Sequence, residues 1–342
     1  MNGNTSSATS INNLLEVKNL ETSFSIDGKL YNAVDNVSFQ VKPRQIVGIV
    51  GESGCGKSVL SLSIMKLLPK GAGNIRSGEI LFDGVHLETM EDKEINNIRG
   101  NDISMIFQEP MTSLNPVFTI GFQLMEVLLN HHKITKKQAR QKSIELLKSV
   151  GISRPEKLVD EYPHQLSGGM RQRVMIAIAI ACQPKLLIAD EPTTALDVTV
   201  QAQILELMKE IQEENNMSVI LITHDLGVVA EMCDEVIVMY AGKIVEKTDV
   251  DTLFYDPKHP YTKLLMEAIP KMDEEVELLS SISGIVPSLK NMPEAGCRFA
   301  ERCPMAMPEC KYITPILASL KDGHEVSCLL YDQGKPREGV DV

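Results

Sequence analysis

The stretch GESGCGKS at residues 51–58 fits the pattern G-x-x-x-x-G-K-[S/T] and decides the fold class. The apolar run IVGIV precedes it and apolar residues recur at helical spacing after it, which predicts a strand, a loop and a helix. Glycines leave backbone N–H groups free to surround a phosphate, and the helix start adds positive potential. We expect Lys57 to reach the β- and γ-phosphates and Ser58 to bind Mg²⁺. The candidate residues of this loop are Gly51, Ser53, Gly54, Cys55, Gly56, Lys57, Ser58 and Val59, with Cys55 interpreted as a small filler.

The composition of the whole chain is that of a globular protein. The chain has 342 residues, of which 43% are apolar and 23% charged, so a chain that is mainly disordered is excluded. The net charge of −12 disfavours a nucleic-acid surface, which needs a basic face. The richest apolar run, residues 174–182, is too short to span a bilayer, and the N-terminus lacks the features of a signal peptide. We therefore expect the chain to stay in the cytoplasm.

The periodicity of the chain predicts an α/β fold. Short Val- and Ile-rich runs before the loop indicate strands, and residues 120–150 show helical spacing. From residue 167 to about 250, strands alternate with helices, which predicts βαβ units and a mostly parallel sheet. Residues 1–13 are almost all polar and are predicted to be a flexible tail.

An acidic motif and a second glycine-rich motif narrow the reactions that the chain could catalyse. The strand LLIAD ends in Asp190, where a P-loop ATPase places a further Mg²⁺ ligand, and Glu191 follows in a position to polarise an attacking water. The alternative is an acidic pair that only caps a strand end. In LSGGMRQR, residues 166–173, Ser167, Gly168 and Gly169 open a helix and form a second anion site. Because one nucleotide does not need two such sites in one chain, we expect this one to complete the pocket of a facing subunit.

Together, GESGCGKS, Gln108 in IFQEP, LSGGMRQ, LLIADE, ALD ending at Asp197, and His224 in LITHD resemble the nucleotide-binding domain of ABC transporters. The resemblance implies an ATPase domain over residues 14–255, with a mostly parallel core sheet, an antiparallel β subdomain and a helical subdomain near 112–175.

The resemblance also implies roles for single residues. Glu191 would be the general base, His224 would contact the γ-phosphate, and Asp197 would belong to the loop that links the two subunits. Gln108 would sense the γ-phosphate and join Ser58 and Asp190 around Mg²⁺. An aromatic ring stacks on adenine in this family; Tyr31 is our candidate, and Phe24 is equally placed in the sequence.

Residues 256–342, here called the C-terminal extension, resemble the small irregular extension of oligopeptide and dipeptide importer ATPases. The resemblance implies a peripheral ATPase at the cytoplasmic face of the membrane, which powers peptide import. Its partners would be a second, paralogous ATPase subunit, two membrane permeases and, indirectly, an external peptide-binding protein. The competing hypothesis is a soluble ABC ATPase of translation, repair or iron–sulfur assembly. Against it, the chain has a single P-loop and a single LSGG motif, and too few residues separate them for an inserted coiled coil.

Four of the seven cysteines cluster near the C-terminus, at Cys297, Cys303, Cys310 and Cys328. Cytoplasmic proteins rarely use thiols for disulfides, so a metal site is the natural expectation. Zinc sites usually contain a C-x₂₋₄-C pair, which is missing here, whereas thiolates on separate loops fit a [4Fe–4S] cluster. The resemblance favours the iron–sulfur cluster; zinc and unmetallated thiols remain alternatives. Cys182 and Cys233 are interpreted as buried fillers on apolar helical faces.

Overall fold

A computed structural model describes residues 13–108, 113–194, 196–268, 282–332 and 335–336. The expectation of a flexible tail falls almost entirely on residues outside these ranges. In the described part of the chain, no helix combines the length and the apolar character needed to cross a membrane.

The central sheet has eight strands, in the spatial order β11 (Ala318–Ser319), β12 (Glu325–Val326), β10 (Lys243–Asp249), β9 (Glu235–Tyr240), β3 (Ile46–Val50), β8 (Ser218–Ile222), β7 (Leu186–Asp190) and β6 (Ile103–Ile106). The strands from β9 to β6 run parallel, which confirms the predicted mostly parallel core. Every residue of β3, β7 and β8 is buried. This burial explains why these strands read as continuous apolar runs rather than as alternating patterns.

A second, antiparallel sheet has the order β2 (Lys29–Val41), β1 (Leu15–Ile26), β4 (Gly73–Phe82) and β5 (Val85–His86). The turn Asp27–Gly28 joins β1 and β2, and both residues have positive φ, as a two-residue hairpin turn requires. Helix α1 (Lys57–Ile64) contacts β1, β2 and β7, so it lies between the two sheets. This sheet is the expected antiparallel subdomain.

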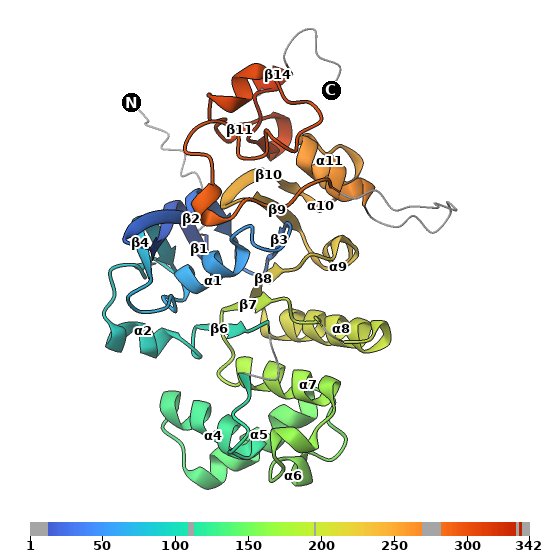
Figure 1. Ribbon diagram of the computed structural model, residues 1–342. Helices are drawn as coiled ribbons and strands as arrows, with labels where there is room; N and C mark the ends of the chain where they lie inside the picture. Colours follow the sequence, from blue (N-terminus) through green and yellow to red (C-terminus); the bar gives the residue numbers. More distant parts are fainter. Residues whose placement is uncertain (1–12, 109–112, 195, 269–281, 333–334, 337–342) are drawn as a thin grey trace, which may run out of the picture.

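The helical subdomain forms a separate lobe at the end of the molecule opposite the C-terminal extension (Figure 1). Its helices are α4 (Ile120–His131), α5 (Lys136–Ser149), α6 (Pro155–Leu158) and α7 (Gly168–Ala179), with the 3₁₀ turn η1 (Pro163–Gln165). Thr119 and Thr135 cap α4 and α5 by accepting hydrogen bonds from backbone N–H groups, which fixes where these helices begin. Their apolar faces share one core, and α4 contacts both α5 and α7.

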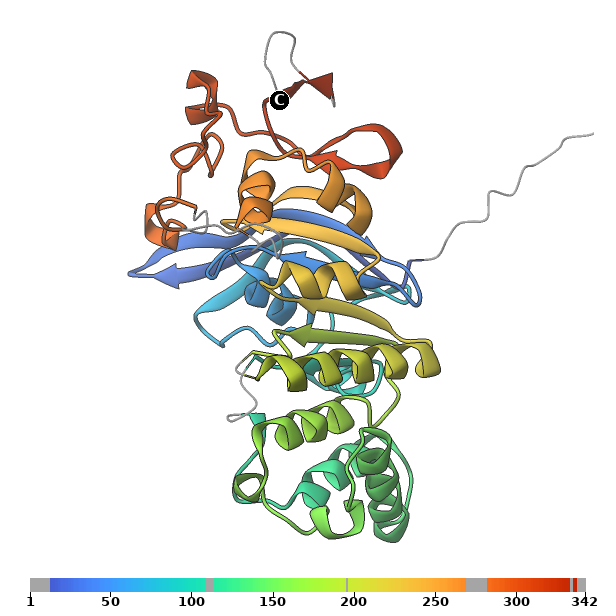
Figure 2. The same ribbon diagram turned by 90° about the vertical axis from the view of Figure 1, so that its right-hand side faces the viewer.

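The remaining helices flank the sheets: α2 (Asp92–Ile98), α8 (Val198–Asn215), α9 (Leu226–Met232), α10 (Val250–Tyr255) and α11 (Pro260–Glu267). Helix α8 lies between the central sheet and the helical lobe in the rotated view (Figure 2).

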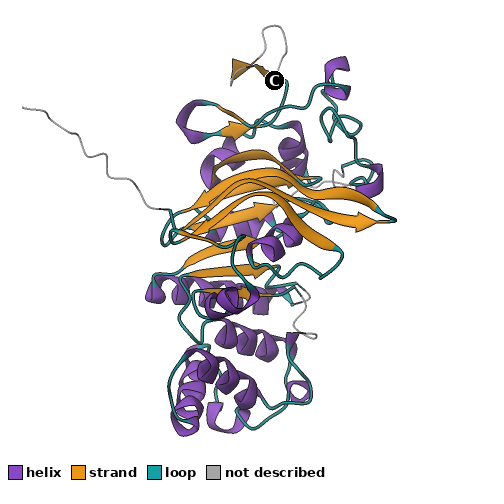
Figure 3. Cartoon of the chain, turned by 90° about the vertical axis from the view of Figure 1, so that its left-hand side faces the viewer, coloured by secondary structure: helices purple, strands orange, loops and turns teal. Residues whose placement is uncertain are grey.

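The described part of the C-terminal extension is built mostly from short elements joined by loops. It contains the turns η2 (Leu289–Asn291), η3 (Pro308–Lys311) and η4 (Lys321–Gly323) and the short pair β13 (Tyr331–Asp332) and β14 (Lys335–Pro336). Its strand β12 pairs with β10 and so extends the central sheet, and its Phe299 is buried in the main core. Figure 3 shows the extension against the sheet edge, at the opposite end from the helical lobe.

One expected filler, Cys182, is placed differently. It follows the end of α7 rather than lying on a helical face, and it is only half-buried. Burial raises the pKa of its thiol to about 11. Cys233 is buried as expected, at the end of α9, where its sulfur faces Gly48 of β3 so closely that a Cβ there would lie 2.9 Å from it.

Candidate functional site

The P-loop connects the buried strand β3 to α1. A Cβ on Gly51 would lie 2.2 Å from the carbonyl oxygen of Met239, and one on Gly56 would lie 2.6 Å from that of Ala33, so only glycine fits at both positions. Gly56 also has φ of 103°, and no described side chain caps the first turn of α1. The N–H groups at this helix start therefore remain available to an anion.

Lys57 points back across the loop. Its ammonium donates to the carbonyl oxygens of Gly51 at 2.6 Å and Glu52 at 3.1 Å, and Cys55 Sγ lies 3.8 Å away. The side chain is buried, although lysines are rarely buried without a counter-charge. It is placed to exchange these neutral oxygens for those of a phosphate.

A cavity of about 480 Å³ opens beside the loop. Its lining includes the expected loop residues from Ser53 to Val59, together with Gln108 and Glu191. Of the two aromatic candidates for adenine, Phe24 lines the cavity, whereas its cross-strand partner Tyr31 is outside the lining. The structure therefore favours Phe24 over Tyr31. Two further lining residues, Leu289 and Met292, come from the C-terminal extension, and no motif indicated them.

Asp190 fits the expected Mg²⁺ ligand. It is 3% exposed, and its Oδ1 has no hydrogen-bond partner among the described residues. Burial raises the pKa of this carboxyl, while a hydrogen bond with Ser58 opposes the rise. A buried carboxylate with an unpartnered oxygen is costly unless a cation or donor occupies the site in use. Ser58 and Asp190 together thus suit a Mg²⁺ ion, which prefers oxygen ligands.

Gln108, Glu191 and His224 follow the parallel strands β6, β7 and β8, so their side chains meet at one edge of the sheet. Gln108 Nε2 donates to Glu191 Oε2 at 2.9 Å, and His224 Nδ1 lies 3.4 Å from Glu191 Oε1. The hydroxyl of Thr194, a residue that the motifs did not indicate, also donates to Glu191 at 2.9 Å.

The backbone and the pKa of Glu191 are both unusual. Its φ of 49° lies in the left-handed region, which is uncommon for a non-glycine residue. Burial raises the pKa of its carboxyl, but the hydrogen bond from Thr194, the charge of His224 and the hydrogen bond from Gln108 outweigh it, and the net pKa is below its usual value. The carboxylate is therefore ionised at neutral pH.

The residues expected to serve a facing subunit lie elsewhere in the chain. Ser167 caps α7 by accepting a hydrogen bond from the N–H of Met170, and Gly168 and Gly169 form the first turn. None of these three residues is among the described residues that line the cavity. Asp197 caps α8 by accepting from the N–H of Val200.

The four clustered cysteines approach one another in the extension. Burial, with a smaller contribution from the neighbouring cysteines, raises the pKa of Cys297 to about 11 and that of Cys328 to about 12. The N–H of Cys297 donates to the carbonyl of Cys310 at 2.7 Å. Within the described ranges, however, no three His, Cys, Asp or Glu side chains are grouped closely enough to hold a metal ion.

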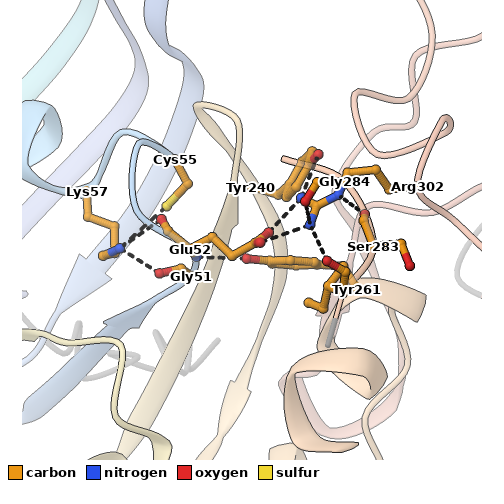
Figure 4. A network of polar contacts seen from close by, with 10 residues as sticks. Gly51, Glu52, Cys55, Lys57, Tyr240, Tyr261, Ser283, Gly284 and Arg302 are labelled. Carbon is orange, nitrogen blue, oxygen red and sulfur yellow. Dashed lines mark hydrogen bonds and ion pairs between the residues drawn. The ribbon is translucent and has the colours of Figure 1, made fainter. Parts of the chain in front are cut away.

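A contact that no motif indicated connects the P-loop to the extension. Arg302 forms an ion pair with Glu52, with a distance of 2.7 Å between Nη1 and Oε2 (Figure 4). The two residues are 250 positions apart, so the sequence carried no local signal for their contact.

Comparisons with known proteins agree over nearly the whole chain. The family profile described as ABC transporter matches residues 34–194, and the profile described as the C-terminal region of oligopeptide/dipeptide transporters matches residues 245–310. The oligopeptide transport ATP-binding protein AppD of Bacillus subtilis is 55% identical, over 94% of this chain and 97% of its own. The dipeptide transport ATP-binding protein DppD of Escherichia coli is 50% identical, over 94% of this chain and 99% of its own.

A solved structure shares the fold of the ATPase part. The dimeric, post-hydrolysis state of the ATP-binding cassette MJ0796, bound to ADP and phosphate, superposes with a TM-score of 0.62 at 28% identity. The match covers 69% of this chain and 98% of that one.

Proposed function

Because the chain belongs to the ABC transporter family, among the ATP-binding proteins of oligopeptide and dipeptide transport, we propose that it hydrolyses ATP to power peptide import through a membrane permease. The observation that carries this proposal is the meeting of Gln108, Glu191 and His224 beside the P-loop. A soluble ABC ATPase without a permease is not favoured, since the relatives are transport proteins over their full length.

The nucleotide would lie along the cavity with its phosphates on the P-loop. Phe24 is placed to stack on the base, and Lys57 to leave the carbonyl oxygens of Gly51 and Glu52 for the β- and γ-phosphates. Ser58 and Asp190 would hold a Mg²⁺ ion, which supplies positive charge at the phosphates.

Hydrolysis would follow from the position of Glu191. Its ionised carboxylate orients a water and accepts its proton, the water oxygen bonds to the γ-phosphorus, and the bond from that phosphorus to the bridging oxygen of ADP breaks. Gln108 and His224 hold Glu191 from two sides and are placed to contact the γ-phosphate. Lys57 stabilises the charge that develops on the phosphoryl oxygens.

The working unit would be a head-to-tail dimer. Ser167, Gly168 and Gly169 do not line the chain's own cavity, which supports their role in the pocket of a partner ATPase. Asp197, at the start of α8, would contact the partner in the same interface. The partner we propose is a paralogous subunit.

An exposed aromatic patch on the helical subdomain is the proposed permease contact. Phe118 and Phe122 stack with ring centroids 4.5 Å apart, and both are exposed, as is Val117 at 70%. Exposed apolar patches of this kind mark interaction sites, and aromatic residues are enriched at interfaces. This contact would hold the chain peripherally at the cytoplasmic face of the membrane and connect Gln108 to the permease.

We expect the tagged chain to co-purify from detergent-solubilised membranes with two permease subunits and a second ATPase. Replacing Phe118 and Phe122 together with Ser should abolish that co-purification and cell uptake of peptides, while ADP binding by the purified chain stays within about twofold of the unmodified protein. Recovery of the unmodified chain free of membranes and permeases in intact cells would overturn the importer function.

For the extension, we propose that Cys297, Cys303, Cys310 and Cys328 hold a [4Fe–4S] cluster of structural role. Each thiolate of such a cluster binds a different iron, so the four sulfurs need not approach as closely as the ligands of one ion. The backbone N–H groups of Phe299, Met305 and Leu330, each two residues after a cysteine, lower the pKa of the thiols of Cys297, Cys303 and Cys328, although burial raises it more. Such N–H groups favour the thiolate form that binds metal.

The anaerobically purified protein is expected to be brown and to contain about four irons per chain. Replacing Cys310 with Ser should remove the colour and the iron, whereas replacing Cys182 with Ser, a half-buried cysteine of the helical subdomain, should change neither. Stoichiometric zinc without iron would contradict the cluster and favour the zinc alternative.

A further inference from the structure

The side chain of Arg302, in the C-terminal extension, is bound to Glu52, the second residue of the P-loop. Its guanidinium makes two parallel hydrogen bonds with Glu52, Nη1 to Oε2 at 2.7 Å and Nη2 to Oε1 at 2.9 Å. The side chain of Arg302 is only 7% exposed. Paired bonds of this kind between guanidinium and carboxylate are among the stronger polar contacts in proteins, and they fix orientation as well as distance.

The other donors of Arg302 hold the guanidinium in place. Nε donates to the carbonyl of Ser283 at 2.8 Å, and Nη1 also donates to the hydroxyl of Tyr240 at 3.3 Å (Figure 4). Phe299, Tyr240 and Tyr261 pack around this position as a buried aromatic cluster, with ring centroids 4.8–5.2 Å apart. Because the extension and β9 share this cluster, Glu52 is tied to a rigid part of the molecule.

Glu52 connects the loop to the extension and does not contact the cavity. It is outside the lining of the cavity, and its backbone N–H donates to the hydroxyl of Tyr261 at 2.8 Å. Its carbonyl oxygen, in contrast, accepts one of the hydrogen bonds of Lys57. A change in the position of Glu52 would therefore move both the entry of the loop and the lysine expected to bind the phosphates.

A second arginine of the extension, Arg298, contacts a turn that lies beside the other end of the loop. It donates to the carbonyl of Ala241 and pairs with Asp35. The adjacent Gly242 donates its N–H to the carbonyl of Cys55 at 2.7 Å. Thus one arginine holds the start of the P-loop directly, and the other holds the turn that supports its end.

We propose that Arg302 and Arg298 are positioning residues that keep the P-loop in its phosphate-binding shape, so that the extension is part of the nucleotide site. The inference rests on the proposed ATP site. Its physical basis is preorganisation: the glycines of the loop have many accessible conformations, and a loop ordered before binding does not lose that freedom when the phosphates arrive.

The test is the affinity of the full chain for MgADP, measured by isothermal titration calorimetry. Arg302→Gln is expected to raise the Kd about tenfold, the change that the loss of a charge-assisted pair produces. Arg302→Lys keeps the positive charge but loses the paired hydrogen bonds, so its Kd should lie between those of the unmodified chain and Arg302→Gln. Arg298→Gln should also raise the Kd. Glu301→Gln, an exposed neighbour that also changes the charge by one, should bind as the unmodified chain does.

A double substitution separates positioning from a general loss of stability. Because Arg302 acts through Glu52, Glu52→Gln with Arg302→Gln should bind MgADP no more weakly than Arg302→Gln alone. In the assembled transporter, the KM for ATP should rise in Arg302→Gln more than kcat falls. A Kd within twofold of the unmodified chain in both Arg302 variants, or additive losses in the double variant, would overturn the inference. If the unmodified chain binds no MgADP, the proposed function itself fails.

Discussion

Replacing Glu191 with Gln is expected to preserve ATP binding and to lower the rate of hydrolysis by about 10²–10⁴-fold, the range for loss of a general base. The amide keeps the size of the side chain and can still accept from Thr194, so the site should keep its shape. It cannot accept a proton from the attacking water. Phosphate release by the variant, assembled with its partner subunit and permease, measures this loss.

The same variant should accumulate as a closed dimer when ATP is present, because the nucleotide that holds the two subunits together is no longer consumed. Size-exclusion chromatography with and without ATP reports this directly. Glu206→Gln, an exposed position on α8 with the same chemical change, should hydrolyse ATP at the unmodified rate. Brisk turnover by Glu191→Gln would exclude Glu191 as the base and leave it a structural role.

The edge that carries Gln108, Glu191 and His224 was predictable because it depends on short-range order. Each residue lies one or two positions after the end of an apolar strand, and parallel strands bring their carboxyl ends to one edge of a sheet. A glycine-rich loop between a strand and a helix is equally local. Motifs of this kind therefore predict both the fold and the position of the proposed catalytic groups.

The contacts between the extension and the ATPase domain could not be predicted in this way. The ion pair between Arg302 and Glu52 depends on how two distant segments pack, and an arginine in the sequence RFAERC has no local feature that names its partner. The sequence likewise could not decide whether Phe24 or Tyr31 is placed to stack on adenine. These two aromatics are direct cross-strand partners, so their place in the sequence does not separate them, and only the packing around the cavity does.

A buried carboxylate, Glu246 of β10, joins three segments of the fold. It is fully buried, and its two oxygens accept hydrogen bonds from the N–H groups of Lys258 at 2.6 Å and His259 at 2.9 Å. His324 Nε2, just before β12 of the extension, lies 2.7 Å from Oε1. The carboxylate therefore connects the central sheet to two parts of the extension, the start of α11 and the segment just before β12.

Glu246→Ala is expected to lower the free energy of unfolding by about 3–5 kcal/mol, the cost of removing one partner of a buried polar pair. The loss arises because the N–H groups of Lys258 and His259 and the ring of His324 would be buried without their acceptor. Since whole domains are stable by only about 5–15 kcal/mol, this is a large fraction of the total. Urea unfolding of the full chain, followed by circular dichroism under anaerobic conditions, measures the change.

The dependence of the free energy of unfolding on pH is a second test of the role of Glu246. Burial raises the pKa of Glu246, but hydrogen bonds, first that from His324, lower it more, and the net pKa is below the ordinary value of 4.5. Because the folded pKa is lower than the unfolded one, the stabilisation is fully present above about pH 4.5 and is lost as the pH falls below it. The stability difference between the unmodified chain and Glu246→Gln should therefore shrink below that pH.

A control is the substitution Glu325→Gln. Glu325 is a partly exposed carboxylate beside Lys247 of the neighbouring strand, so its loss should cost less than about 1 kcal/mol. Equal losses from the two Gln variants would show that the buried position of Glu246 adds no stability beyond that of a partly exposed carboxylate.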